Sequence, residues 1–147
     1  MPAETLVDGE LVACDADRRP DLPRLLRRHG LTDPWRIRQA PQWCPVRYVL
    51  FDVLYHAGHC LLREPLAQRR HVLAEIYQRL DAPEVWFSAG VIGDGKAFYE
   101  AAVAQGQEGV MAKHLASSYR PGRRSAAWRK IKPRLKGNGA ACGMASY

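Results

Sequence analysis

The chain has 147 residues, 47% of them hydrophobic, which is enough for one ordinary domain with its own core or for part of a larger one. Hydrophobic and aromatic residues run through most of the sequence and exclude long charge-rich disorder. Its 22 basic and 15 acidic residues give a formal net charge of +7, which favours a polyanionic partner such as nucleic acid. The competing explanation is an arginine-rich composition that has no bearing on function.

The cysteines and the apolar segments predict a protein of a reducing compartment. Cys14, Cys44, Cys60 and Cys142 form no CxxC pair and match no zinc spacing. We therefore expect reduced thiols, with Cys14 and Cys60 buried. The first ten residues lack the features of a signal peptide, and no apolar run approaches the ~20 residues of a membrane span. We expect a cytoplasmic protein without membrane contact.

The first part of the chain predicts a strand and a short helix. A strand is expected over Thr5–Cys14, with Gly9 at a bend or a close backbone approach. Asp21 can cap a helix that runs to about His29. The segment 32–45 holds three prolines, so we expect an irregular connection there.

The middle of the chain holds the strongest periodic signals. Residues 46–55 predict a strand, and their near-continuous apolar run indicates burial on both faces. A helix is expected over 65–80, with Arg69 as a charged exception on an apolar stripe made of Leu66, Leu73, Ile76, Tyr77 and Leu80.

The remaining elements are shorter. A strand is expected over 85–88, a helix over 94–105, and strands over 109–114 and 127–131, the last two separated by a polar, arginine-rich loop. The order predicts an α+β fold of mixed, largely antiparallel sheets with flanking helices, forming one domain over 1–135. Residues 136–147 show no periodicity, and we expect a disordered tail.

Two lysines near the end of the chain predict an anion site. Lys130 and Lys132 stand two apart in a predicted strand, so their ammonium groups point to one face. Like charges on one face repel unless an anion lies between them, and a triphosphate serves this purpose because lysine binds phosphate as a point charge. A solvated basic edge is the alternative.

Glu108, before Gly109, places a carboxylate where a strand begins. Magnesium is held in proteins by one or two carboxylates together with phosphates, so Glu108 could be a metal ligand. An exposed glutamate at a turn is the alternative. Lys113 follows at an odd interval and is expected on the opposite face unless the strand bends at the glycine.

Upstream residues could hold the rest of a nucleotide. Phe51 could stack on a purine base or be an ordinary core residue. Asp52, inside an apolar strand, requires a partner. Glu10 could accept hydrogen bonds from a ribose or be exposed. Arg120, Arg123 and Arg124 lie in a hydroxyl-rich loop that suits contacts with DNA phosphates; the alternative is a solvated loop without a ligand.

The order and spacing of these motifs resemble the adenylation (nucleotidyltransferase) domain of ATP-dependent DNA ligases, most closely the bacterial end-joining repair type. The resemblance runs from residue 4 to about 135, over the stretches 6–13, 46–55, 62–70, 108–113 and 119–132. It implies a partial adenylation domain with an ATP-grasp-like fold. It also implies ATP or AMP with Mg²⁺ as ligands, nicked or broken double-stranded DNA as substrate, and nucleoid association in a bacterial cytoplasm.

The same resemblance implies roles for individual residues. Glu10 is similar to the residue that contacts the ribose, and Phe51 to the one that stacks on adenine. Glu108 is similar to the metal-associated carboxylate. Lys130 and Lys132 are similar to the catalytic lysines that contact the phosphates. The implied chemistry is adenylation of a lysine, transfer of AMP to a 5′-phosphate at a nick, and sealing by the 3′-hydroxyl.

The chain also departs from that family. Its first lysine is Lys96, so the family's Lys-x-Asp-Gly nucleophile, which precedes the stretch Asp8-Gly9-Glu10, is missing. The oligonucleotide-binding domain that follows in full ligases is missing too. We expect a fragment that does not adenylate itself. The alternatives are half of a split ligase whose partner chain supplies the lysine, a non-catalytic DNA- or nucleotide-binding module, an inert remnant, and an RNA ligase or capping-type enzyme. End-joining repair proteins are the other partners that the resemblance implies.

Overall fold

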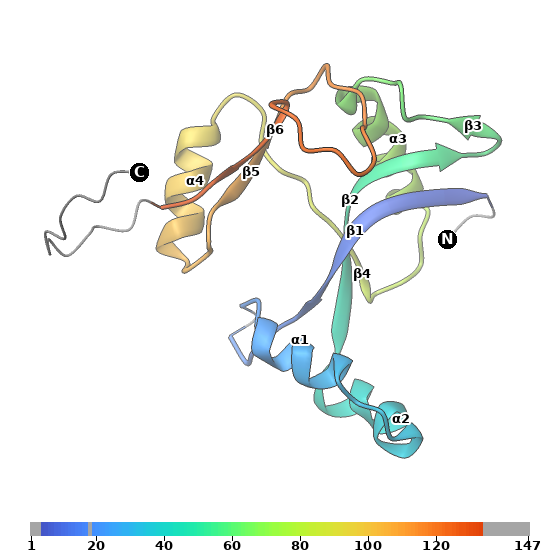
Figure 1. Cartoon of the computed structure of the whole chain (residues 1–147), viewed down its shortest axis with the longest axis vertical. Helices are drawn as coiled ribbons and strands as arrows, with labels where there is room; N and C mark the ends of the chain where they lie inside the picture. The colour runs from blue at the N-terminus through green and yellow to red at the C-terminus, as the bar shows by residue number, and fades with distance from the viewer. Residues whose placement is uncertain (1–3, 18, 134–147) are drawn as a thin grey trace, which may run out of the picture. The chain divides into compact units, whose positions relative to one another are not determined.

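The structure is a computed structural model that describes residues 4–17 and 19–133. Two compact units are present, one of Met1–Gly90 with His114–Arg124 and one of Val91–Lys113 with Ser125–Tyr147. Helices accompany mostly antiparallel strands, which confirms the α+β class (Figure 1). The expected tail at 136–147 lies outside the described residues. None of the helices in the described ranges is both long enough and apolar enough to cross a bilayer.

A long antiparallel ribbon forms the first unit. Strand β1 (Thr5–Ala13) pairs with β2 (Val46–His56), which pairs on its other edge with β3 (His59–Cys60) and, in parallel, with β4 (Val85–Phe87). The register between β1 and β2 shifts after Asp8, because Asp8 faces Asp52 while Gly9 faces Leu50. This shift leaves Phe51 opposite no residue of β1, as in a β-bulge.

Helix α3 (Leu66–Gln78) packs against β2 and closes the core of the first unit. The core consists of Leu50 and Val53 from β2 with Leu73 and Ile76 from α3. These helix residues belong to the predicted apolar stripe. Along β2 only Leu50, Asp52 and Val53 are buried, so the expected burial on both faces is wrong outside the centre of the strand.

A helical hairpin joins β1 to β2 and corrects the prediction for 32–45. Helix α1 (Leu22–His29) is followed by α2 (Pro34–Trp43) where an irregular connection is expected (Figure 1). Asp33 caps α2 by accepting a hydrogen bond from the Arg36 N–H at 2.8 Å. Pro34 is the first helical residue, where a missing N–H costs nothing, and Pro41 lies close to the helix end. Pro34 and Pro41 therefore lie within the helix, and Pro45 follows its end.

The cysteines also differ from expectation. Cys60 is exposed and Cys14 is only half-buried, so their predicted burial is wrong. Cys60 belongs to the two-residue strand β3, which is too short to cover it. Of the three cysteines that the structure describes, Cys44, at the end of α2, is the fully buried one.

The second unit consists of a helix and a two-stranded sheet. Helix α4 (Gly95–Ala104) packs on β5 (Val110–Lys113), which pairs antiparallel with β6 (Trp128–Ile131). Gly109, just before β5, has a φ of 139°, and a Cβ there would lie 2.0 Å from the Ile131 carbonyl oxygen. Only glycine allows this close approach of the two strands.

Candidate functional site

Glu108, Lys130 and Lys132 form a compact group in the second unit, here called the Lys–Glu–Lys cluster. The Lys130 Nζ donates a hydrogen bond to Glu108 Oε2 at 2.6 Å, and the Lys132 Nζ donates to Glu108 Oε1. The three side chains remain 47–66% exposed. The anion expected between the two lysines is thus a carboxylate of the chain itself, held where solvent and ligands can reach it.

The two ammonium groups hold the Glu108 carboxyl group ionised. Hydrogen bonds from Lys130 and then Lys132 lower the pKa of Glu108 from 4.5 to about 2, and the charges of both lysines act in the same direction. The carboxylate is therefore ionised throughout the neutral range. It counters one of two positive charges, so the cluster keeps a net charge of +1.

The β5–β6 register determines which side chains share a face with the cluster. In the β5–β6 register, Met111 faces Lys130 and Lys113 faces Trp128. Residues directly opposite in an antiparallel pair share a face, so Lys113 and Lys130 lie on the same face. The Lys113 Nζ lies 3.9 Å from the centre of the Trp128 ring, which is a cation–π contact.

One metal ligand, at most, is available in the cluster. Among the described residues no group of three or more His, Cys, Asp or Glu side chains could hold a metal ion. Glu108 is a hard oxygen donor and fits Mg²⁺ only as part of a coordination shell completed by phosphate oxygens or water. The donor set agrees with a metal that arrives with its nucleotide.

Glu10 and Phe51 lie on neighbouring strands of the first unit. Glu10 is exposed and faces Val49 in the β1–β2 register, while Phe51 is half-buried in the bulge of β2. Bulges re-aim side chains and are frequent beside binding sites. The Phe51 carbonyl oxygen accepts a hydrogen bond from Arg70 Nη1 at 3.1 Å.

Arg70 fixes this bulge from α3, and the sequence gives no sign of it. Its guanidinium group also donates to the carbonyl oxygens of Ser88 and Ala89 and lies 4.4 Å from the Phe87 ring centre. Burial lowers the pKa of Arg70, opposed by the nearby Asp52 charge. Arg70 ties the end of β4 to β2 at the position of Phe51.

A buried network lies behind the same strands. Asp52 pairs with Arg69 through two hydrogen bonds of 2.8 Å, and both side chains are fully buried. Arg69 Nη1 also donates to the carbonyl oxygens of Glu64 and Ser117 at 2.6 and 3.0 Å. The partner that Asp52 requires is therefore Arg69, the charged exception on the apolar stripe of the helix.

Tyr119 extends this network to β1. Its hydroxyl group donates to Asp8 Oδ2 at 2.7 Å, and the Arg69 guanidinium carbon lies 5.8 Å from its ring centre. Burial and the hydrogen bond to Asp8 raise the pKa of Tyr119 to about 12. Sequence reasoning assigns no role to Asp8 or Tyr119 individually, although both stand inside the quoted motifs.

The arginines predicted to contact DNA phosphates lie in the loop that contains Tyr119. Arg120, Arg123 and Arg124 are all exposed, around a turn at Gly122 that has a φ of 67°. This arrangement leaves their guanidinium groups open to a ligand. Their contact with DNA stays a prediction.

Comparison with known proteins identifies the family. Residues 2–132 match the ATP dependent DNA ligase domain. The chain belongs to this family. It is 38% identical to a DNA ligase of Methanothrix thermoacetophila, over 89% of this chain and 23% of that one, and 36% identical to a probable DNA ligase of an Anaeromyxobacter species, over 90% and 25%. The chain thus spans about a quarter of the length of these ligases.

Solved structures of ligases show the same fold. The ligase domain of Mycobacterium tuberculosis LigD superposes with a TM-score of 0.69 at 30% identity, over 87% of this chain and 38% of that one. A mycobacterial DNA ligase D complexed with ATP and MES gives a TM-score of 0.68 at 30% identity. A Lig E DNA ligase, at 21% identity and a TM-score of 0.59, shares the fold.

Proposed function

We propose that this chain is the phosphate-binding part of an ATP-dependent DNA ligase adenylation domain, of the bacterial end-joining type. The observation that carries the proposal is the Lys–Glu–Lys cluster. Its two exposed ammonium groups share one carboxylate that lies 22 and 24 residues earlier in the sequence, and the pairing of β5 with β6 brings the three side chains together. The similarity to LigD and to a mycobacterial ligase complexed with ATP supports it.

A phosphate would bind the cluster by competing with Glu108. Phosphate oxygens form charge-assisted hydrogen bonds with ammonium groups, as the carboxylate does, and carry more negative charge. Lys130 and Lys132 would turn from the carboxylate to the phosphate, which frees Glu108. The freed carboxylate can then contribute one oxygen ligand to Mg²⁺, which when bound neutralises charge on the phosphates.

The remaining assignments extend the proposal to nucleotide and DNA. Glu10 and Phe51 are proposed to contact ribose and adenine, and Arg120, Arg123 and Arg124 the backbone of a nicked duplex in a bacterial cytoplasm. Residues 1–95 contain no lysine that could accept AMP. The last step needs no lysine–AMP adduct: the nick's 3′-hydroxyl attacks the adenylated 5′-phosphate, forms the phosphodiester bond and releases AMP.

Sealing of a nicked duplex that already carries 5′-AMP tests this step. We expect slow, Mg²⁺-dependent sealing by the parent chain. Lys130→Ala should reduce the sealing rate about 100-fold or more, because it removes a hydrogen-bond donor that stabilises the charge developing in the transition state. Lys96→Ala is the matched control, because Lys96 is an exposed lysine of the same unit, 4.0 Å from Glu100, and its loss changes the net charge equally.

The second candidate is a binding module without catalysis, favoured by the formal net charge of +7. Under this alternative the parent chain binds nicked DNA with a steep dependence on salt but seals no adenylated nick. Equal sealing by parent and Lys130→Ala would instead contradict the role of the cluster.

A further inference from the structure

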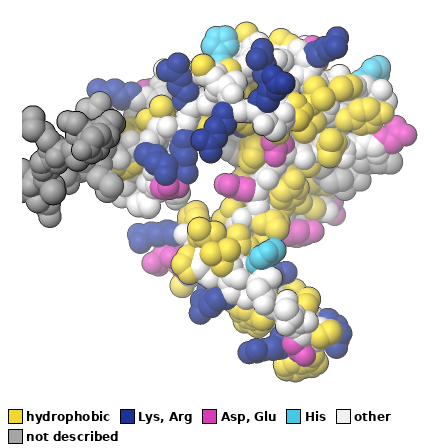
Figure 2. All heavy atoms as spheres, in the orientation of Figure 1, with side chains coloured by type: hydrophobic (Ala, Val, Ile, Leu, Met, Phe, Trp, Pro, Cys, Tyr) yellow, Lys and Arg dark blue, Asp and Glu magenta, His cyan; other side chains and the backbone are white. Residues whose placement is uncertain are grey.

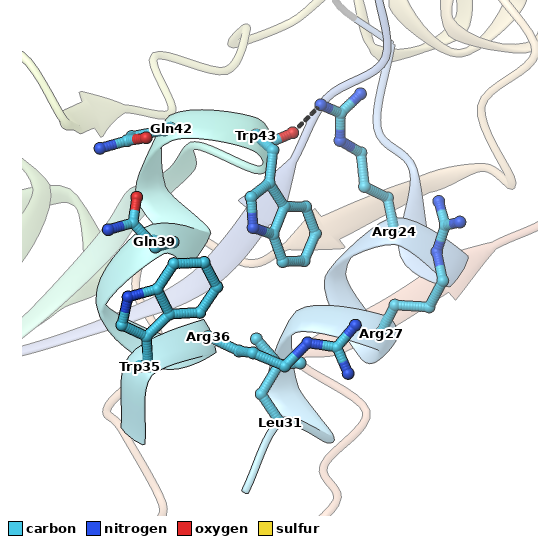
Figure 3. Close-up of a pocket in the computed structure, with 8 residues that line it drawn as sticks. All are labelled: Arg24, Arg27, Leu31, Trp35, Arg36, Gln39, Gln42 and Trp43. Carbon is cyan, nitrogen blue, oxygen red and sulfur yellow. Dashed lines mark hydrogen bonds between the residues drawn. The ribbon is translucent and has the colours of Figure 1, made fainter. Parts of the chain in front are cut away.

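We propose that the α1–α2 hairpin carries a second nucleic-acid site, which binds single-stranded DNA by stacking bases on Trp35 and Trp43 and contacting phosphates through Arg27 and Arg36. The two helices enclose a groove of about 650 Å³ (Figure 3). It includes none of the residues predicted for ATP, Mg²⁺ or duplex phosphates, so this inference goes beyond the proposed function.

The aromatic part of the groove comes from α2. Trp35 and Trp43 are 63% and 44% exposed, although tryptophan is usually well covered in a folded protein. Positions 35, 39 and 43 follow one another at intervals of four, so Trp35, Gln39 and Trp43 lie along one side of the helix. Figure 3 shows both indole rings among the side chains that line the groove. Exposed indole faces bind bases of any sequence, since every base has a π-face.

The basic part of the groove comes from both helices. Arg24 and Arg27 line it from α1, and Arg36 reaches from α2 toward α1 (Figure 3). Among the described residues, no carboxylate lines the groove or forms an ion pair with Arg27 or Arg36. Residues 22–43 contain five arginines and one aspartate, a formal charge of +4 with histidine neutral. Figure 2 shows dark blue and hydrophobic side chains intermixed over this hairpin.

Three side-chain hydrogen bonds join α1 to the end of α2 in the absence of a ligand. Arg24 Nη2 donates to the Trp43 carbonyl oxygen, and Arg28 Nη1 donates to the Cys44 carbonyl oxygen at 2.5 Å. The buried Cys44 thiol donates a hydrogen bond to the Arg24 carbonyl oxygen, with 3.7 Å between sulfur and oxygen. These hydrogen bonds hold the end of α2 against α1 before a ligand arrives, which reduces the entropy cost of ordering the hairpin on binding.

Charge complementarity selects the occupant. A protein segment that covered the two tryptophans would leave the arginines buried without partners unless it supplied several carboxylates. Single-stranded DNA supplies exposed bases for the two indole rings and one phosphate per nucleotide for the guanidinium groups that line the same groove. Duplex DNA offers phosphates but keeps its bases stacked inside.

Binding of a fluorescently labelled oligothymidine of about 15 nucleotides, followed by anisotropy without ATP, tests the proposal. Trp35→Ala should weaken binding roughly 10-fold, and Trp43→Ala should act in the same direction. Arg27→Gln with Arg36→Gln should also weaken binding and reduce the slope of log K against log salt by about 1.4, the value for two phosphate contacts on a single strand.

The controls separate this site from general charge and from the ligase site. Arg63→Gln with Arg79→Gln removes the same charge from two exposed positions of the same unit and should leave the affinity nearly unchanged. Lys96→Ala should bind the oligothymidine like the parent, and Trp35→Ala should retain binding of Mg²⁺-ATP. A chain that binds oligothymidine but not ATP would therefore contradict only the proposed function.

Three results would overturn the inference. One is equal affinity of the parent and Trp35→Ala for oligothymidine. Another is an equal loss in the Arg27/Arg36 and Arg63/Arg79 double variants. The third is self-association that Trp35→Ala abolishes while DNA affinity stays the same, which would make the groove a contact between copies of the chain. Circular dichroism of each variant checks that these substitutions of exposed residues leave the fold intact.

Discussion

At the scale of single residues, the hydrogen bond between Tyr119 and Asp8 predicts a weakness at high pH. The folded-state pKa of Tyr119 is raised from 10.0 to about 12, so the folded state holds its proton more tightly than the unfolded chain. The associated stability is fully present below pH 10 and is lost as pH rises towards 12. Burial and the Asp8 charge also raise the pKa of Tyr48, so the test compares the parent with Tyr119→Phe, in which tyrosinate absorbance should show the loss of a titration near pH 12. A high-pH absorbance change of the same amplitude in the parent and in Tyr119→Phe would contradict the assignment.

Each member of the Asp52–Arg69 pair should be indispensable while the other is present. Both side chains are fully buried, so removal of one partner leaves an uncompensated buried charge. Asp52→Asn or Arg69→Met should each lower the free energy of unfolding by about 3–5 kcal/mol. The double variant should lose much less than the sum of the two, because no charge remains unpaired. Urea unfolding measures all three, and strictly additive losses would be inconsistent with the pairing.

The sequence identifies Asp52 and Arg69 as unusual residues, but it does not predict that they contact each other. An aspartate inside an apolar strand requires a partner, and Arg69 interrupts an apolar stripe, so both stand out as exceptions. Their contact depends on how α3 lies across β2, which no local pattern specifies. Arg70, beside Arg69, carries no such signal, since an arginine next to the stripe reads as a solvated residue.

At the scale of elements, Gly109 is the point on which the β5–β6 pair depends. An alanine Cβ at this position would lie 2.0 Å from the Ile131 carbonyl oxygen, and the φ of 139° is unfavourable for any L side chain. Gly109→Ala should therefore destabilise the pair by about 1–3 kcal/mol and weaken nucleotide binding, since Lys130 lies in β6.

Gly95→Ala is the matched control for Gly109→Ala. Gly95 begins α4, its φ is not positive, and a Cβ there meets nothing within 4 Å. The control should be neutral or stabilise by up to about 1 kcal/mol, since alanine favours helices. Thermal unfolding and ATP titration of both variants check the expectation, and equal effects of the two substitutions would show that Gly109 is not special.

Most elements follow from periodicity, and the exception has a physical cause. The strands around Asp8 and Val53, helices α1, α3 and α4, and the β5–β6 pair all lie where the pattern predicts them. Helix α2 does not, because three prolines in 32–45 suggest disruption while one of them occupies the first helical position. The sequence signal for this helix is Asp33 directly before Pro34, since an aspartate at the N-cap and a proline at the first position are typical of a helix start, and the Asp33 side chain accepts from the Arg36 N–H.

At the scale of the whole molecule, the predicted site residues are divided between the two units. Glu10, Phe51 and the three loop arginines belong to the first unit, and the Lys–Glu–Lys cluster belongs to the second. The order of motifs in the sequence predicts the family, which the match over residues 2–132 confirms. It does not predict that Glu108 itself accepts from both lysines, because that contact depends on the backbone approach at Gly109.

Equilibrium binding of Mg²⁺-ATP to the parent chain, Lys130→Ala and Lys96→Ala tests the central claim most directly, because it needs no DNA and no chemical step. Loss of one charge-assisted hydrogen bond costs about 1.5–3 kcal/mol, so Lys130→Ala should bind roughly 10- to 100-fold more weakly. Lys96→Ala should bind like the parent. Equal affinities of the parent and Lys130→Ala, or an equal loss in both variants, would contradict a phosphate site at Glu108, Lys130 and Lys132.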